Sequence, residues 1–224
     1  MCEWEIATGE YVKCTAEEIC DAEEEGLIFN YYVDEYSIDS LNNWVEPLNL
    51  KCVPDHKIER MGNWYYSGEI VGGFMIARVP DLYGRKWPLV ICTCIQLPLM
   101  IIVIFSTSFE LTTAIGFIMG ILHMGIYNGC YINICEYVHL RWKNKACSLL
   151  LVFDMLTCII IAVYWRFISK NWLWLQIFAC ASNALGLIGL FFIPESPEYL
   201  YCFYRFNECR EVIFSIALWN SGKV

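Results

Sequence analysis

Residues 87–106 of this chain are WPLVICTCIQLPLMIIVIFS, a run in which no side chain carries a charge. About 20 predominantly apolar residues are enough for a helix to cross the hydrocarbon core of a bilayer. Four more stretches of spanning length flank this run, at residues 64–79, 111–134, 147–168 and 172–193, and 64–79 is the least apolar of them. Because the links are short, the sequence predicts an all-α membrane bundle of about five transmembrane helices within residues 63–200.

The composition agrees with a membrane protein and excludes several other classes. Hydrophobic residues make up 58% of the 224 residues and charged residues 17%, whereas soluble domains carry about 25% charged residues. The sequence has no cluster of basic residues of the kind that binds nucleic acid, so nucleic acid is not a predicted partner. The sequence also contains no Walker loop, no HExxH motif and no metal-ligand spacing at Cys92 and Cys94. The prediction is therefore a protein that is not an enzyme and has no cofactor.

The acidity of the chain is concentrated in residues 1–62, which hold 15 of the 24 acidic residues and 4 of the 15 basic ones. This head segment has scattered aromatic residues, which favours a folded loop over a disordered tail. It begins with acids rather than with the basic and then apolar pattern of a signal peptide. Its four cysteines predict two disulfides if the segment is extracytoplasmic, with three possible pairings, and free thiols if it is cytosolic; these are Cys2, Cys14, Cys20 and Cys52.

Basic residues in the short links predict the orientation of the bundle, because they favour the cytoplasmic side. The first and third links hold six of them and the fourth holds two: Arg78, Arg85, Lys86, Arg141, Lys143 and Lys145 against Arg166 and Lys170. We therefore expect residues 1–62 outside and the tail, residues 201–224, in the cytoplasm. The membrane itself is either the plasma membrane or that of an internal organelle.

Glycines spaced four apart predict close helix contacts, because small residues let backbones approach each other in lipid. The pairs are Gly68 with Gly72, Gly116 with Gly120, and Gly125 with Gly129. The alternative is that glycine is simply common in membrane helices.

Residues 72–86, GGFMIARVPDLYGRK, lie between the first two apolar spans. This stretch resembles the signature loop of the major facilitator superfamily, between that family's second and third helices. Asp81, Gly84, Arg85 and Lys86 match the signature. Ala77 stands where a glycine is usual and Leu82 where a basic residue is usual.

Three further stretches strengthen the resemblance. The run from Glu136 to Arg141 is similar to the Glu-x-x-x-x-Arg that ends the family's fourth helix. The run Pro194 to Leu200, PESPEYL, resembles the end of the sixth helix in the sugar-porter and organic-ion branches, with Glu198 in place of a basic residue. Residues 43–52, NWVEPLNLKC, resemble the stretch before the second helix of organic cation and anion transporters.

The resemblance implies that the five spans correspond to helices two to six of such a carrier, in an N-terminal half without its first helix. The chain is then expected to be a fragment, a truncated gene model or a reduced paralogue. In the relatives the head segment is an outer loop, which accounts for its lack of an export signal. The implied function is transport of a small organic solute, an organic ion or a sugar-like molecule, by alternating access. Alternatives are a non-transporting structural or regulatory subunit and a half-size carrier that dimerises.

The resemblance also implies a cytoplasmic charge network that holds the inner helix ends together in one state of the carrier. Its members are Asp81, Arg85, Glu136, Arg141 and Glu195, with Gly84 and Lys86 in the same loop. The alternative is that these are ordinary loop charges that only orient the bundle.

Two acids lie within apolar spans, where a charge is costly and functional by default. Glu69 and Asp154 are therefore candidates for contact with a cation or proton, and the alternatives are a hydrated Glu69 and an Asp154 paired with a neighbouring helix. Tyr127, Asn128 and Tyr131 occupy the span that lines the cavity in the relatives, where aromatic rings hold cations, although core packing is the alternative. His123 is a weaker candidate for a proton relay.

Overall fold

The computed structural model describes residues 2–5, 11–14, 18–21, 31–33, 44–45, 47–50, 52–76 and 78–221. Ala77, which departs from the loop signature, lies outside the described residues. The described strands are β1 (Cys2–Glu5), β2 (Tyr11–Cys14) and β3 (Tyr31–Val33). The helices are α2 (Asp55–Ile76), α3 (Val79–Tyr83), α4 (Lys86–Phe105), α5 (Phe109–Tyr137), α6 (Leu140–Val163), the π-helical turn η1 (Tyr164–Ile168), α7 (Trp172–Phe192), α8 (Pro197–Cys202) and α9 (Phe206–Ser221).

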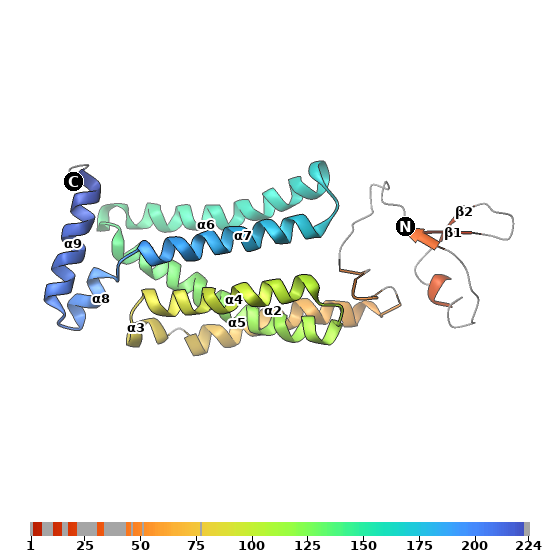
Figure 1. Cartoon of the computed structure of the whole chain (residues 1–224), viewed down its shortest axis with the longest axis horizontal. Coiled ribbons are helices and arrows are strands. Elements are labelled where there is room, and N and C mark those ends of the chain that lie inside the picture. The colour runs from red at the N-terminus through yellow and green to blue at the C-terminus, as the bar shows by residue number, and fades with distance from the viewer. Residues whose placement is uncertain are drawn as a thin grey trace.

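Long apolar helices dominate this arrangement and confirm the predicted class, an all-α membrane bundle. Within the described residues, four segments are long and apolar enough to cross a membrane: α4, α5, α6 with η1, and α7. Most of the predicted first span lies in α2, which has 22 residues but carries polar and charged side chains in its first turns. The three short strands and a short helical turn at residues 18–21 belong to the head segment and lie apart from the long helices (Figure 1).

Two helices begin earlier than the apolar pattern predicts. α2 begins at Asp55 rather than near residue 64, and α6 begins at Leu140 rather than near residue 147. Hydropathy locates the part of a helix that matches lipid, whereas backbone hydrogen bonds continue through polar residues beyond it. The basic residues of the third link between apolar spans, Arg141, Lys143 and Lys145, accordingly lie in the first turns of α6.

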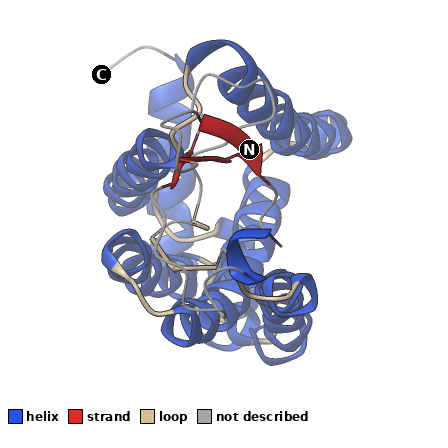
Figure 2. Cartoon of the chain, turned by 90° about the vertical axis from the view of Figure 1, so that its right-hand side faces the viewer, coloured by secondary structure: helices blue, strands red, loops and turns tan. Residues whose placement is uncertain are grey.

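The long helices run roughly parallel or antiparallel to one another (Figure 1). α6 and α7 lie on one side of the bundle, and α2 and α4 lie on the other. α5 packs against α2 and α4, contacts α6, and so joins the two groups, while α4 also packs against α7. Figure 2 views the bundle from the end that carries the strands, with most helices nearly end-on. Each long helix therefore has one end at each of the two ends of the bundle.

The tightest packing is between α2 and α5, and glycines make it possible. A Cβ placed on Gly68 would lie 2.2 Å from the carbonyl oxygen of Phe117, and one on Gly120 would lie 2.2 Å from that of Tyr65. Gly72 meets the backbone of Ile121 in the same way. By contrast, a Cβ on Gly116 meets nothing within 4 Å. Only part of the predicted glycine pattern therefore lies in a close helix contact.

α6 and α7 are mostly exposed. In α4 and α5, about a third of the most apolar segment is buried inside the protein. In α6 almost none of the corresponding segment is buried, and in α7 none is. Large side chains on their outer surfaces include Phe153, at 60% exposure, and Phe192, at 77%. Such a surface matches lipid, in which apolar side chains cost nothing to expose.

The head segment carries a small sheet of order β2-β1-β3, in which β1 pairs antiparallel with both neighbours. A disulfide joins Cys20 to Cys52, immediately before α2. The backbones of Cys2 and Cys14 are register partners in the sheet, but their side chains lie outside the described part of the chain, so their pairing remains a prediction. The Trp44 ring lies 5.5 Å from the Trp172 ring at the start of α7, and this contact connects the segment to the bundle.

Candidate functional site

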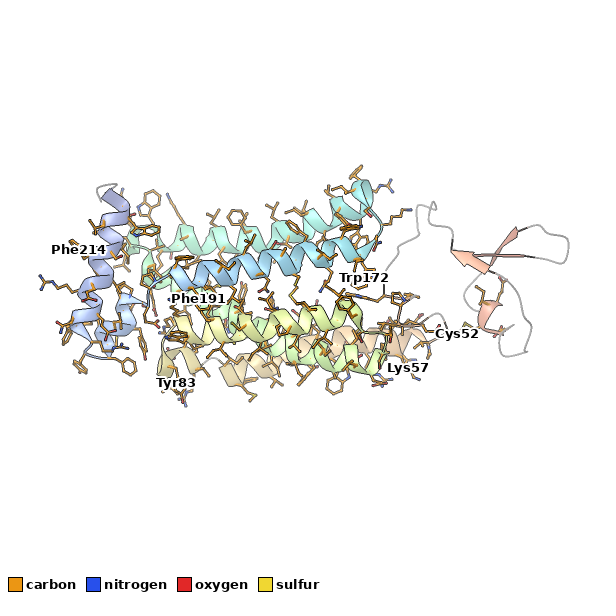
Figure 3. The ribbon with its side chains drawn as sticks, in the orientation of Figure 1. Cys52, Lys57, Tyr83, Trp172, Phe191 and Phe214 are labelled. Carbon is orange, nitrogen blue, oxygen red and sulfur yellow. A yellow bond between two sulfur atoms is a disulfide. The ribbon has the colours of Figure 1, made fainter. Side chains whose placement is uncertain are left out.

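The residues of the signature loop gather at the end of the bundle opposite the head segment. Figure 3 shows Tyr83 and Phe191 at this end, and Lys57 and Trp172 at the other. α3, the start of α4, the end of α5 and the start of α8 all meet here. We call the group formed by Asp81, Arg85, Glu136 and Glu195 the charge cluster.

Arg85 is the centre of the charge cluster. Its Nε donates to Glu136 Oε1 at 2.9 Å, and its Nη1 donates to Asp81 Oδ1. The Arg85 and Glu136 side chains are only 15% and 9% exposed, whereas Asp81 is 63% exposed. Breaking a buried pair by removing one partner is strongly destabilising, while an exposed pair contributes little. The Arg85–Glu136 arm is therefore the one that fastens α5 to the start of α4.

Two opposing effects act on the guanidinium of Arg85. Burial lowers its pKa, but the hydrogen bond to Asp81 and the charge of Glu136 raise it, and the net pKa lies above its ordinary value. Arg85 therefore stays positively charged across the physiological pH range.

Glu195 caps the start of α4, although the two lie more than a hundred residues apart in the sequence. Its Oε1 accepts hydrogen bonds from the backbone N–H groups of Arg85 at 2.8 Å, Lys86 at 3.1 Å and Ser196 at 3.1 Å. The first N–H groups of a helix have no partner within the helix and carry partial positive charge. α4 has no capping side chain at its own N-cap, so Glu195 supplies both the acceptor and the complementary charge.

Gly84 leaves room for this carboxylate. Its φ is +99° and its ψ is 165°, a region that is essentially reserved for glycine. A Cβ at Gly84 would lie 2.7 Å from Glu195 Oε2. The glycine of the signature thus serves both the turn and the close approach of Glu195.

Other contacts at this end come from residues that the sequence analysis did not select. The Tyr137 hydroxyl donates to the carbonyl oxygen of Pro194, and the Tyr199 hydroxyl donates to that of Leu82 at 3.3 Å. Ser196 is fully buried and accepts from the Tyr199 N–H as the N-cap of α8. A serine before proline is a sequence signal for such a cap, whereas no local pattern predicts the two tyrosine contacts.

Two more predicted members behave differently. Lys86 Nζ donates to the carbonyl oxygen of Phe191 at the end of α7, at 3.0 Å. Arg141 is exposed in the first turn of α6, and its backbone N–H donates to His139. In the part of the chain that the structure describes, the Arg141 side chain forms no ion pair, so the structure does not bring it into the charge cluster.

Glu69 forms a polar contact between α2 and α5. Its Oε1 lies 2.8 Å from His123 Nδ1, and the two side chains are 25% and 43% exposed. The Tyr65 ring lies 6.2 Å from the His123 ring. Glu69 is thus paired with His123, the histidine predicted as a candidate for a proton relay. Asp154 lies on the exposed surface of α6, with no hydrogen bond or ion pair to any residue that the structure describes.

An apolar pocket of about 260 Å³ opens between α4, α5 and α7 near the charge cluster. On α5 it is lined by Cys130, Asn133, Ile134, Tyr137 and the following Val138. Tyr127, Asn128 and Tyr131 lie on a neighbouring part of the α5 surface and do not line this pocket; Tyr131 is 38% exposed. Among the described residues, no group of three His, Cys, Asp or Glu side chains is placed to hold a metal ion.

The structure combines apolar helices of spanning length with a charge cluster that joins the signature loop to the end of α5 and to the segment before α8. These are the features of a multi-pass membrane protein of the transporter class. Comparison with known families agrees, because the model of the family "Sugar (and other) transporter" matches residues 29–222. The chain therefore belongs to this family of the major facilitator superfamily, and its similar relatives place it in the organic cation branch. This confirms the family expected from the sequence.

Three relatives illustrate the match. Solute carrier family 22 member 4 of Mus musculus is 29% identical over 195 residues, covering 84% of this chain and 34% of the relative. Organic cation/carnitine transporter 2 of Homo sapiens is 25% identical over 191 residues, covering 83% and 34%. Organic cation/carnitine transporter 6 of Arabidopsis thaliana is 29% identical over 158 residues, covering 68% and 30%. The chain thus spans about a third of the length of the curated relatives that it matches.

Proposed function

We propose that this chain supplies five helices of one half of a carrier that moves a small organic solute by alternating access. The observation that carries the proposal is the charge cluster, in which the side chains of Arg85 and Glu195 tie together α3, α4, α5 and the start of α8. Such a cluster acts as a latch between two states of the carrier, holding the helix ends together in one state and releasing them in the other.

The energetics of the charge cluster fit a latch. At a helix end that water can reach, charged groups pair in one state and hydrate in the other, so the two states differ by about a few kcal/mol. A ligand with modest preference for one state then shifts the balance. The 63% exposure of Asp81 places one arm of the cluster in contact with water, while the buried Arg85–Glu136 arm gives the closed arrangement its stability.

We assign the solute contact to the Glu69–His123 pair. Both residues lie well inside helices and both are partly exposed, so a bound cation reaches them without displacing the helix packing. The names of the relatives point to organic cations and carnitine, and a carboxylate within an apolar helix attracts the positive group that these share. The nearby Tyr65 ring offers an aromatic face to the same group.

We further propose that the charge cluster faces the cytoplasm and the head segment faces outside, as the basic residues near the cluster favour. In intact cells, we expect an impermeant maleimide to label Cys20 and Cys52 only after a reductant opens their disulfide, as read by peptide mass spectrometry. Cys202, exposed near the charge cluster, serves as the control and is labelled only after permeabilisation. The opposite pattern, with Cys202 labelled in intact cells, would reverse this orientation.

Uptake of labelled tetraethylammonium and carnitine by cells that express the chain tests the function itself. We expect saturable uptake above that of cells with an empty vector, and a loss of about tenfold or more in Glu69→Gln, because a lost charge contact of about 1.4 kcal/mol changes affinity tenfold. Glu59→Gln, on the exposed first turns of the same helix, is the matched control and should not change uptake.

The same experiment separates the alternatives. A wild-type chain that reaches the membrane and transports neither compound would favour a non-transporting structural or regulatory subunit. Uptake that appears only when chemical cross-linking detects a dimer would favour a half-size carrier that dimerises. Unchanged uptake in Glu69→Gln would refute the role of Glu69 while leaving transport in place.

A further inference from the structure

Two cysteines on consecutive helices lie with their thiols in contact. Cys135 is in the last turn of α5 and Cys147 is in the second turn of α6, twelve residues later, and their Sγ atoms are 2.9 Å apart in a thiol–thiol hydrogen bond. Cys147 is buried and Cys135 is half-buried. Tyr131 lies one helical turn before Cys135 on α5. The charge cluster uses none of these three side chains, so their arrangement is not explained by it.

The contact brings the two sulfur atoms close to bonding distance. A disulfide has an S–S length of about 2.05 Å, so the two sulfurs need to approach by only about 0.9 Å. α5 and α6 are neighbours in the bundle, and only Val138 and His139 separate them in the chain. The packing of α5 against α6 therefore already holds the two sulfur atoms close together.

We propose that Cys135 and Cys147 form a reversible dithiol–disulfide switch that fastens α5 to α6 in the presence of a peroxide. One thiolate attacks the O–O bond of hydrogen peroxide, which gives a sulfenic acid and releases hydroxide. The second thiol attacks the sulfenic sulfur, the S–S bond forms and water leaves, so that overall two thiols are oxidised and the peroxide is reduced to two waters. A cellular thiol such as glutathione reverses the reaction by exchange.

The position of the pair gives the switch its consequence. Cys135 directly precedes Glu136, whose carboxylate holds Arg85. A covalent bond from Cys135 to α6 restrains the end of α5 and with it the buried arm of the charge cluster. The bond itself does not depend on the proposed transport function, whereas its effect on transport does.

Trypsin makes the bond directly measurable, because Arg141, Lys143 and Lys145 all lie between the two cysteines. Membranes that contain the chain are treated with hydrogen peroxide, alkylated and digested. We expect the Cys135 and Cys147 peptides to stay joined without reductant and to separate with it. Separate peptides after peroxide treatment of the wild type would overturn the proposal.

Variants assign the bond to this pair. The joined peptide pair should disappear in Cys135→Ser and in Cys147→Ser, and it should persist in Cys130→Ser, a matched control on the same helix. A maleimide polymer adds mass to each thiol that remains free, so it counts the thiols lost on peroxide treatment. If Cys135→Ser loses as many thiols to peroxide as the wild type does, the reaction belongs to other cysteines and the switch is overturned. The joined peptides, residues 87–141 and 146–166, hold six cysteines between them, so tandem mass spectrometry of the wild-type pair must locate the bond at Cys135 and Cys147. That measurement decides the existence of the bond even if a variant fails to fold.

Discussion

Glu195→Ala is expected to lower the free energy of unfolding by about 3 kcal/mol or more, because hydrogen bonds to charged groups contribute about 1.5–3 kcal/mol each. The substitution removes the acceptor of three backbone N–H groups, those of Arg85, Lys86 and Ser196. Two of these donors are at the start of α4, which has no other cap. In a thermal melt of the detergent-purified chain, a change of this size lowers the Tm by about 6–12 °C for a chain of this length.

Glu198→Gln is the matched control, since Glu198 lies three residues away and is exposed. Its Tm should stay close to that of the wild type. Gly84→Ala probes the same carboxylate from the other side, because its Cβ would lie 2.7 Å from Glu195 Oε2, and we expect a smaller loss of about 1–3 kcal/mol. If Glu195→Ala melted no lower than Glu198→Gln, the capping role of Glu195 would be wrong.

The second large effect is expected for Gly120→Ala at the contact between α2 and α5. The added Cβ would lie 2.2 Å from the carbonyl oxygen of Tyr65, whereas carbon–oxygen contacts in tightly packed helices are about 3.3–3.6 Å long. The two backbones must therefore separate by about 1 Å. Because this loosens the packing along the whole interface, we expect a destabilisation of about 3 kcal/mol, at the upper end of overpacking effects.

Gly116→Ala provides a control one turn away on the same helix, where a Cβ meets nothing within 4 Å. Alanine is the better helix former by about 0.8–1 kcal/mol, so this variant should melt at the wild-type temperature or slightly above. Gly68→Ala should resemble Gly120→Ala, because it meets the carbonyl oxygen of Phe117 at the same distance. Equal melting of Gly116→Ala and Gly120→Ala would contradict the close α2–α5 contact.

The membrane class and the family followed from local patterns. A run such as residues 87–106 reports a spanning helix because lipid demands apolar side chains over a fixed length. The signature around Asp81 and Arg85 identified the family because glycine and charged residues at fixed spacing are rare beside apolar spans. The first residues of α2 and α6 were harder to predict from the sequence, because the first turns of both helices are polar and hydropathy marks only the apolar part of a helix.

In the candidate site, too, some residues were predicted from the sequence, whereas most of their contacts were seen only in the structure. The resemblance grouped Asp81, Arg85, Glu136 and Glu195 in one charge network, but it did not give the hydrogen bonds of Glu195 to the start of α4. It also included Arg141, whose side chain lies apart from them. The pairing of Glu69 with His123 joins residues 54 positions apart, and hydropathy alone treats each as an isolated polar residue. The Cys135–Cys147 contact was likewise invisible, because cysteines in apolar spans are ordinarily small hydrophobic residues.

The sequence alone determined that this chain lies in a membrane, that it is helical and that it carries the loop of a facilitator carrier, because each of these depends on residues that are neighbours in the chain. Only the tertiary structure decided that Glu195 caps α4, that Gly120 admits the backbone of α2 and that two thiols meet between α5 and α6. Those contacts join segments that folding brings together, and their distances depend on how whole helices pack rather than on any local pattern.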